Sequence, residues 1–147
     1  MQNNMEQDSF DLINDPMSGA EQSTAIMKRV QNQILKDKLL EHERKCRLCG
    51  VMDKRFLNAI HIKPWRVANE AERLDPENAF LFCPNHEVLF EKGFISFSST
   101  GKVLVSPFLA ETSRLFMNVQ DNFYIKMTAA QVDYIKYHRD KVFKKIG

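Results

Sequence analysis

No stretch of this sequence approaches the ~20 consecutive apolar residues that a membrane-spanning helix needs. The first ten residues, MQNNMEQDSF, also lack the basic and apolar regions of a secretory signal. The chain has no internal repeat and no low-complexity segment. Its 147 residues, 44% hydrophobic and 27% charged, are typical of a single soluble globular domain. We therefore expect a cytoplasmic protein with no membrane partner.

Cysteine is scarce, and the three cysteines present cannot form a closed set of disulfides. Cys46 and Cys49 form a C-x-x-C pair in CRLCG, and Cys83 and His86 form a C-x-x-H pair in CPNH. Zinc takes four sulfur or nitrogen ligands in a tetrahedron, and pairs at this spacing supply two each. The alternative is that these are three buried cysteines and a surface histidine without a metal. The pattern favours zinc, and because protein ligands fill all four positions, the site is predicted to be structural.

Basic residues are absent from residues 1–27, which carry five acids and a net charge of −5. Residues 28–66 carry eleven Lys or Arg against four acids, a net charge of +7. A basic block beside a metal site indicates a polyanionic partner, most simply nucleic acid. The alternative is an ordinary solvated helix face, and charge alone does not decide between them.

The hydrophobic pattern predicts an α+β domain over residues 21–147, preceded by a flexible acidic tail over residues 1–20. Ser18 and Glu21 have capping-box spacing, so a helix should run to about Glu43. Its predicted apolar stripe has Ile26, Val30 and Ile34 and is extended by Leu35, Leu39 and Leu40. The other predicted elements are strands at 56–62 and 79–82, a short helix at 85–92, a hairpin of 94–97 with 103–105, and a final helix that starts at a second capping box, Thr128 to Gln131, with Val132, Ile135 and Val142 facing inward.

Four further residues lie between or beside the two half-sites and carry candidate chemistry. His61 ends the first predicted strand, and its ordinary pKa of about 6.5 suits a general base. Glu87 and Glu91 are four residues apart, so both carboxylates lie on one helix face, where they suit a hard cation such as magnesium or manganese. Asn78 could orient the base or bind the metal through its carbonyl oxygen. Each also has a structural interpretation: a strand-end histidine, two solvated acids and a turn asparagine.

The stretch from Cys46 to Ser106 resembles HNH endonucleases of the ββα-metal type. The phrases HIKPW, RLDPENAFLFCPNH and LFEKGFISF are similar to one subfamily, with a pattern of A-x-H-I-K-P-W followed by N-G-L-x-L-C-x-x-H-D-A-L-F-D-x-G-x-I-S-F. The segment YHRDKVF at residues 137–143 also resembles the terminal helix of that subfamily. The resemblance covers about 100 residues, and the motif core spans residues 46–106.

This resemblance implies a ββα-metal, treble-clef-like core with a structural zinc, flanked by an N-terminal and a C-terminal helix. It implies metal-dependent hydrolysis of DNA phosphodiesters, with His61 as the general base and Asn78 as the central asparagine. Glu87 and Glu91 fall on the positions that bind the catalytic magnesium or manganese. The last three residues that it implies, Lys63, Trp65 and Arg66, would contact the DNA backbone.

This sequence departs from the family pattern at three points. Ile60 stands where other members have a metal-binding Asp or His, Ala79 stands where glycine is usual, and the helix acids are Glu rather than Asp. These departures keep a second hypothesis open, in which the chain is a catalytically weakened or silent zinc module that binds DNA or a protein. A single HNH site cuts one strand at a time, so a homodimer would be one route to double-strand breaks.

Overall fold

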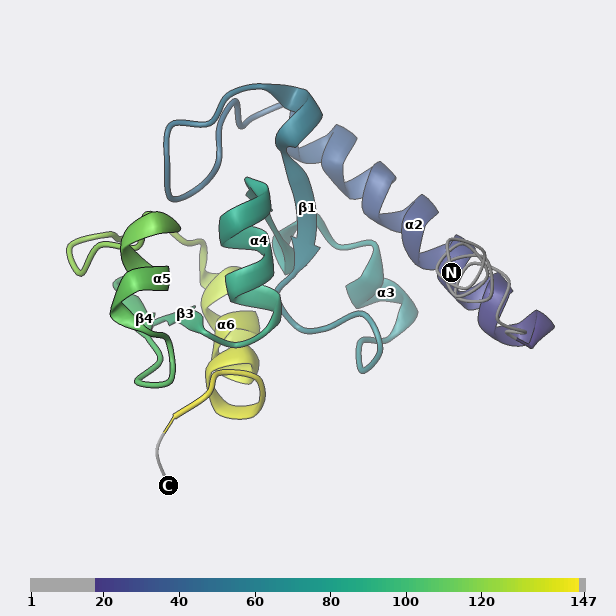
Figure 1. Ribbon diagram of the computed structural model, residues 1–147. Coiled ribbons are helices and arrows are strands. Elements are labelled where there is room, and N and C mark those ends of the chain that lie inside the picture. The colour runs from purple at the N-terminus through teal and green to yellow at the C-terminus, as the bar shows by residue number, and fades with distance from the viewer. Residues whose placement is uncertain (1–17, 146–147) are drawn as a thin grey trace, which may run out of the picture. The chain divides into compact units, whose positions relative to one another are not determined.

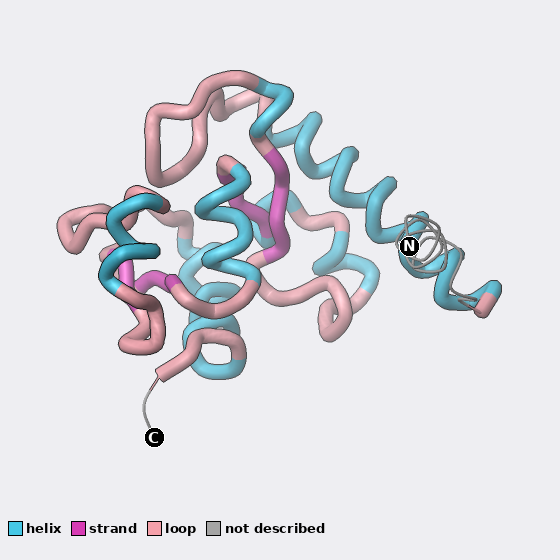
Figure 2. Tube along the Cα trace, in the orientation of Figure 1, coloured by secondary structure: helices cyan, strands magenta, loops and turns pink. Residues whose placement is uncertain are grey.

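The computed structural model describes residues 18–145, so the predicted tail lies almost wholly outside the described residues. Two compact units divide the chain at Val30 and Gln31, and they are described separately below. The elements follow in the order α2 Gly19–Leu39, η1 Lys54–Phe56, β1 Asn58–His61, α3 Glu70–Arg73, η2 Pro76–Asn78, β2 Ala79–Phe82, α4 Pro84–Glu91, β3 Ile95–Phe97, β4 Val103–Val105, α5 Glu111–Phe116 and α6 Ala129–Lys141 (Figures 1 and 2).

The described part of the first unit, residues 18–30, consists of the first turns of α2. The predicted capping box is confirmed: Glu21 N–H donates to Ser18 Oγ at 3.0 Å, and Ser18 N–H donates to the Glu21 carboxylate at 3.2 Å. The first part of the predicted apolar stripe is wrong, because Ile26 and Val30 are 59% and 49% exposed. Burial on α2 begins only at Gln31 and continues through Leu35 and Leu39, a neighbouring row of the same helix.

The second unit is built on two antiparallel strands followed directly by a helix. β1 pairs with β2 in a register that sets Asn58 opposite Phe82 and His61 opposite Ala79. α4 starts two residues after β2 and packs against both strands. Figure 1 shows α4 lying beside β1. This β1–β2–α4 arrangement confirms the predicted α+β core, with α2 before it and α6 after it.

The hydrophobic core forms around β1, β2 and α4, because β2 is buried along its whole length. Phe80 and Phe82 meet Phe90 of α4 and Phe97 of β3, with ring centroids 5.4–6.5 Å apart. Aromatic pairs at these separations stabilise a core beyond their buried area. This packing holds α4 against the strands and thereby fixes the positions of the side chains that α4 carries.

The remaining elements match the sequence prediction in part. The hairpin forms as β3 and β4, and the second capping box begins α6 at Thr128. On α6, Ile135 is fully buried whereas Val132 and Val142 are only half-buried. Helix α5 was not predicted, since Leu115 and Phe116 are exposed and give it no buried stripe. Within residues 18–145, none of the helices has the length and hydrophobicity that a bilayer crossing requires.

Candidate metal centre and catalytic site

The fold brings the two predicted half-sites together at the N-terminus of α4. One ligand atom from each of Cys46, Cys49, Cys83 and His86 lies within 4.8 Å of the other three. Cys49 Sγ is 3.7 Å from Cys83 Sγ, and His86 Nδ1 is 3.4 Å from both Cys46 Sγ and Cys83 Sγ. A zinc tetrahedron with bonds of about 2.3 Å to sulfur and about 2.0 Å to nitrogen has edges of about 3.5–3.8 Å. The donor set and its spacing therefore fit zinc.

His86 is oriented for this role by the loop that follows α5. Its Nε2 donates to the carbonyl oxygen of Asn118 at 3.0 Å, which leaves Nδ1 with the lone pair facing the sulfurs. Asn118 has a positive φ of 56° and ends α5, where Val119 N–H bonds back to the Arg114 carbonyl. Asparagine tolerates this left-handed position at a helix C-terminus. The loop that follows the unpredicted helix α5 thus supplies a contact that orients a predicted metal ligand.

The thiols are crowded in a way that favours a cation. Burial, reinforced by the neighbouring Cys46 and Cys83, raises the pKa of Cys49 to about 12. Three thiolates packed this closely repel one another, and a positive ion at their centre would relieve that repulsion. Among the described residues, this is the single convergence of three or more Cys, His, Asp or Glu ligand atoms.

His61 lies at the end of β1 and is 6% exposed. Its Nε2 is 2.9 Å from the main-chain carbonyl oxygen of Arg73, the last residue of α3. A carbonyl oxygen can only accept, so Nε2 carries the proton and, in the neutral ring, Nδ1 carries the lone pair. The sequence pointed to His61 but gave no signal for Arg73, because the contact uses its backbone.

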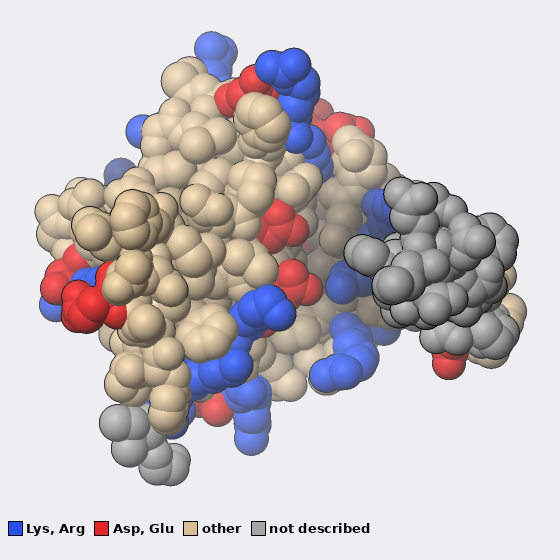
Figure 3. Space-filling view, in the orientation of Figure 1, with Lys and Arg blue, Asp and Glu red and all other residues tan. Residues whose placement is uncertain are grey.

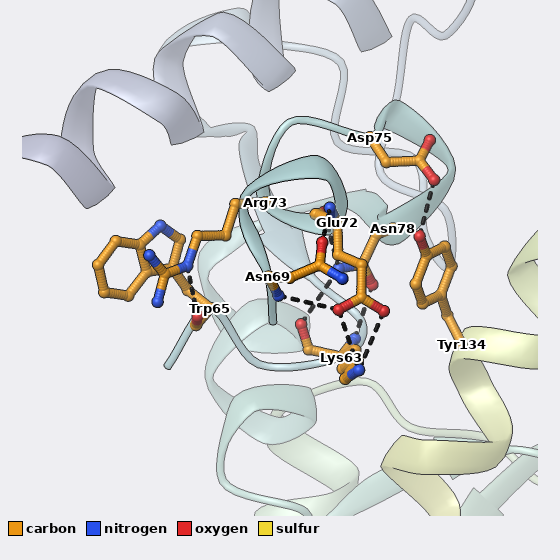
Figure 4. Close-up of polar contacts among 8 residues, drawn as sticks. All are labelled: Lys63, Trp65, Asn69, Glu72, Arg73, Asp75, Asn78 and Tyr134. Carbon is orange, nitrogen blue, oxygen red and sulfur yellow. Dashed lines mark hydrogen bonds and ion pairs between the residues drawn. The ribbon is translucent and has the colours of Figure 1, made fainter. Parts of the chain in front are cut away.

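Asn78 is fully buried and uses its whole amide within the fold. Its Oδ1 accepts from Lys63 N–H at 2.8 Å, and its Nδ2 donates to the carbonyls of Lys63 at 3.3 Å and Glu72 at 3.1 Å. It therefore joins the segment after His61 to helix α3, as Figure 4 shows. Of its two predicted roles, this geometry favours orienting the base over binding the metal.

Glu87 and Glu91 lie on α4, one turn apart, downstream of His86. Glu87 is half-buried and accepts a hydrogen bond from Asn58 Nδ2 at 2.9 Å, whereas Glu91 is exposed. Burial and the charge of Glu91 raise the pKa of Glu87, against the lowering effect of Asn58. The two carboxylates thus influence each other, and β1 supplies Asn58 as a contact that the sequence did not suggest.

The three predicted DNA contacts occupy different environments. Lys63 Nζ forms an ion pair with Glu72 at 2.9 Å. Trp65 is 9% exposed, and its indole N–H donates to Gln31 Oε1 at 2.6 Å. Arg66 is exposed. Because Trp65 uses its polar atom inside the fold, the geometry favours Arg66 for contact with a phosphate backbone.

The charges on the surface near α4 are mixed. On the face drawn in Figure 3, acidic side chains lie near the middle, close to α4 in the same orientation of Figure 1. Lysine and arginine side chains gather beside and below them. This distribution is compatible with a cation bound by the acidic side chains and a polyanion bound by the basic side chains around them.

This chain was compared with protein families, curated proteins and solved structures. Residues 46–98 match the family model described as HNH endonuclease. A solved structure titled "Modification dependent TagI restriction endonuclease" aligns with a TM-score of 0.44 and 22% identity, over 69% of this chain and 34% of that chain. This chain thus spans about a third of the length of that structure. A search of curated proteins found no match.

The matched segment contains all four residues of the Cys/His cluster, both strands of the β1–β2–α4 unit and the predicted base His61. Residues 46–98 of this chain are therefore similar to the HNH endonuclease family.

Proposed function

We propose that this protein is a metal-dependent DNA endonuclease in which His61 activates the attacking water. The observation that carries the proposal is the bond from His61 Nε2 to the Arg73 carbonyl, within a segment that matches the HNH family. This bond assigns the proton to Nε2, and Nδ1 would then be the atom that accepts a proton from water. The substrate class follows from the family and from the basic residues around the site.

In the proposed reaction, His61 Nδ1 takes a proton from water while the water oxygen forms a bond to phosphorus. The bond from phosphorus to the 3′ oxygen breaks, and the leaving oxygen takes a proton from solvent. Asn78 and Lys63 hold the segment beyond β1, so that the imidazole stays aligned during the transfer. Arg66, the exposed member of the predicted contacts, would hold the DNA backbone by charge.

We further propose two distinct metal roles. The Cys46, Cys49, Cys83 and His86 cluster would hold zinc, which fixes the N-terminus of α4 against the knuckle at residues 46–49. Glu87 and Glu91 would hold magnesium or manganese, which supplies charge stabilisation for the scissile phosphate and the leaving oxygen. Two carboxylates completed by substrate phosphate oxygens and water are the usual ligands of magnesium.

The second candidate function is a zinc-stabilised module that binds DNA or a protein partner without cutting. Two observations favour this function. Ile60, at the position where other members have a metal ligand, is buried and apolar. Glu87 is also partly engaged by Asn58. Both features reduce the number of groups that can hold a second metal.

Plasmid cleavage separates the two functions. Purified, zinc-loaded protein is incubated with supercoiled DNA and either magnesium or manganese, and nicked and linear forms are separated by electrophoresis. The endonuclease proposal predicts nicking that stops when the divalent cation is omitted. Binding of DNA without cleavage under every metal condition would favour the silent module. Linear product that rises with the square of protein concentration would support a homodimer.

A further inference from the structure

The short helix α3 carries the Arg73 carbonyl oxygen, which orients His61. This helix needs contacts from outside itself to stay in place. A helix of four residues has too few internal hydrogen bonds to be stable by itself. The carbonyl groups in the last turn of a helix lack an intrahelical partner, and His61 supplies the donor for the one at Arg73. The position of this carbonyl must therefore be fixed by side chains around α3.

The first half of that support comes from the capping residues of α3. Asn69 Oδ1 accepts from Glu72 N–H at 2.8 Å, and Glu72 Oε1 accepts from Asn69 N–H at 2.9 Å. The Asn69 N–H and the Lys63 ammonium together lower the pKa of Glu72. Figure 4 shows this carboxylate between Asn69 and Lys63, with the buried Asn78 amide beside it.

The second half comes from the side chain of Arg73 itself. Its guanidinium carbon lies 3.6 Å from the centroid of the Trp65 ring, and its Nε donates to the Trp65 carbonyl at 2.9 Å. Figure 4 shows Arg73 extended along Trp65 at the end of the network away from Tyr134. Trp65 is anchored in turn by its bond to Gln31. Stacking of a planar cation on a buried indole fixes the orientation of Arg73 more firmly than a solvated charge would.

We propose that Arg73, stacked on Trp65, is a positioning residue for His61. The stacked side chain holds the Arg73 carbonyl oxygen within hydrogen-bond distance of His61 Nε2, and this hydrogen bond keeps the imidazole proton on Nε2. This inference rests on the proposed role of His61 as the base, but its structural content does not require cleavage. Arg73 acts through His61 and does not touch the DNA. Trp65 thereby acts as the anchor of the base-orienting helix, a role separate from the DNA contact that the sequence predicted.

The ring proton of His61 gives a direct readout of this proposal. The full-length, zinc-loaded protein is labelled with ¹⁵N on histidine, and ring ¹H–¹⁵N spectra are recorded at pH 8. A spectrum of His61→Ala assigns the His61 signals by their loss. The wild-type ring should show the Nε2–H tautomer alone. Arg73→Ala should show a mixture of both tautomers, and Arg73→Lys should lie between them.

Arg139→Ala is the matched control, because Arg139 also donates to a main-chain carbonyl, that of Phe97 at 3.0 Å. It should lose stability while leaving the His61 spectrum unchanged. In cleavage assays, Arg73→Ala should lower kcat by about tenfold or more, the expected effect of a misplaced catalytic group, and should leave KM within about twofold. Arg139→Ala should leave both constants unchanged.

An unchanged His61 spectrum in folded Arg73→Ala would overturn the proposal, even if kcat falls. If Arg73→Ala does not fold, the spectrum of Arg73→Lys decides in the same way. Absence of cleavage by the wild type would count against the endonuclease proposal alone, since the tautomer measurement does not depend on activity. The two proposals therefore fail separately.

Discussion

At the scale of single residues, Asn78 shows how one buried amide organises the site. It accepts one hydrogen bond and donates two, all to the main chain of Lys63 or Glu72. A buried amide in which both ends are satisfied fixes the relative position of the two backbone segments it joins. Asparagine is suited to this position because it combines an acceptor and two donors on one short side chain.

The substitution Asn78→Asp tests this account of the amide. A carboxylate would face the carbonyl oxygens of Lys63 and Glu72 without a proton to share, which should lower the free energy of unfolding by about 2–4 kcal/mol. Urea denaturation measures the loss. Asn122→Asp, a change of the same chemistry at an exposed residue, is the control and should cost little. A loss below about 1 kcal/mol at position 78 would mean that the amide does not hold the segments together.

His138 provides a second prediction at this scale. It is 1% exposed, lies between Ser96 and the Phe90 carbonyl, and burial lowers its pKa from 6.5 to about 4. Above pH 6.5 the ring is neutral in both the folded and unfolded states, so stability is complete. As the pH falls from 6.5 toward 4, only the unfolded chain takes up the proton, and stability is lost. By pH 5 the loss should reach about 2 kcal/mol.

The measurement is the free energy of unfolding at pH 7.5, 6 and 5, for the wild type and for His138→Gln. The zinc ligands also take up protons in acid, but they do so in both proteins. The difference between the two pH profiles therefore isolates His138. Profiles that run parallel would contradict the assignment of a buried neutral ring.

At the scale of elements, α4 connects the predicted zinc site to the predicted magnesium site. It begins after Cys83, carries His86 in its first turn and carries Glu87 and Glu91 on the same short span. Its far end is held by His138, which donates to the Phe90 carbonyl and stacks on the Phe90 ring at 3.8 Å. A helix fixed at both ends presents its carboxylates in one place, which favours binding of a cation that demands regular geometry.

Glu87→Gln tests the cation site on α4. Manganese binding to the zinc-loaded protein, measured by calorimetry, should weaken by about tenfold or more, because one of two charged ligands is lost. Binding by the wild type should also weaken as the pH falls, since the raised pKa of Glu87 lets protons compete. Glu111→Gln, on the exposed start of α5, is the control. Equal affinities for the wild type and the Glu87 variant would remove Glu87 from the site.

The sequence predicted those elements whose ends are marked by local chemistry. Strand β2 has the predicted bounds, since Asn78 and Cys83 frame a short apolar run. Both capping boxes form, because they need only residues three apart. The predicted apolar stripe on α2 was right at Leu35 and Leu39 and wrong at Ile26 and Val30. Two neighbouring rows of that helix carry apolar residues, and only the row of Leu35 and Leu39 is buried.

In the candidate site, too, the features marked by local sequence were predicted and the contacts made by the tertiary fold were not. The Cys/His cluster was predicted, because its half-sites are visible as short motifs. The contacts of Arg73, Asn118 and His138 were not, because two use backbone carbonyls and the third joins residues 42 positions apart. Such contacts depend on the tertiary fold and leave no periodic signal in the sequence.

At the scale of the whole molecule, the proposed zinc closes a chain segment from Cys46 to His86 that contains β1, α3 and β2. The site does not exist in the unfolded chain, so the free energy of zinc binding becomes free energy of folding. Elemental analysis should find one zinc per chain. A strong chelator, or Cys83→Ser, should abolish the cooperative melting transition. Unchanged melting of a metal-free protein would contradict a structural zinc.

The central claim is that His61 activates water for cleavage of DNA, and one comparison tests it most directly. Single-turnover cleavage of a plasmid is measured with magnesium or manganese for the wild type and for His61→Ala, at matched zinc content and matched melting temperature. Removal of a general base should slow cleavage by about 10²–10⁴-fold while DNA binding is retained. Cleavage by the folded His61 variant at the wild-type rate would contradict the account.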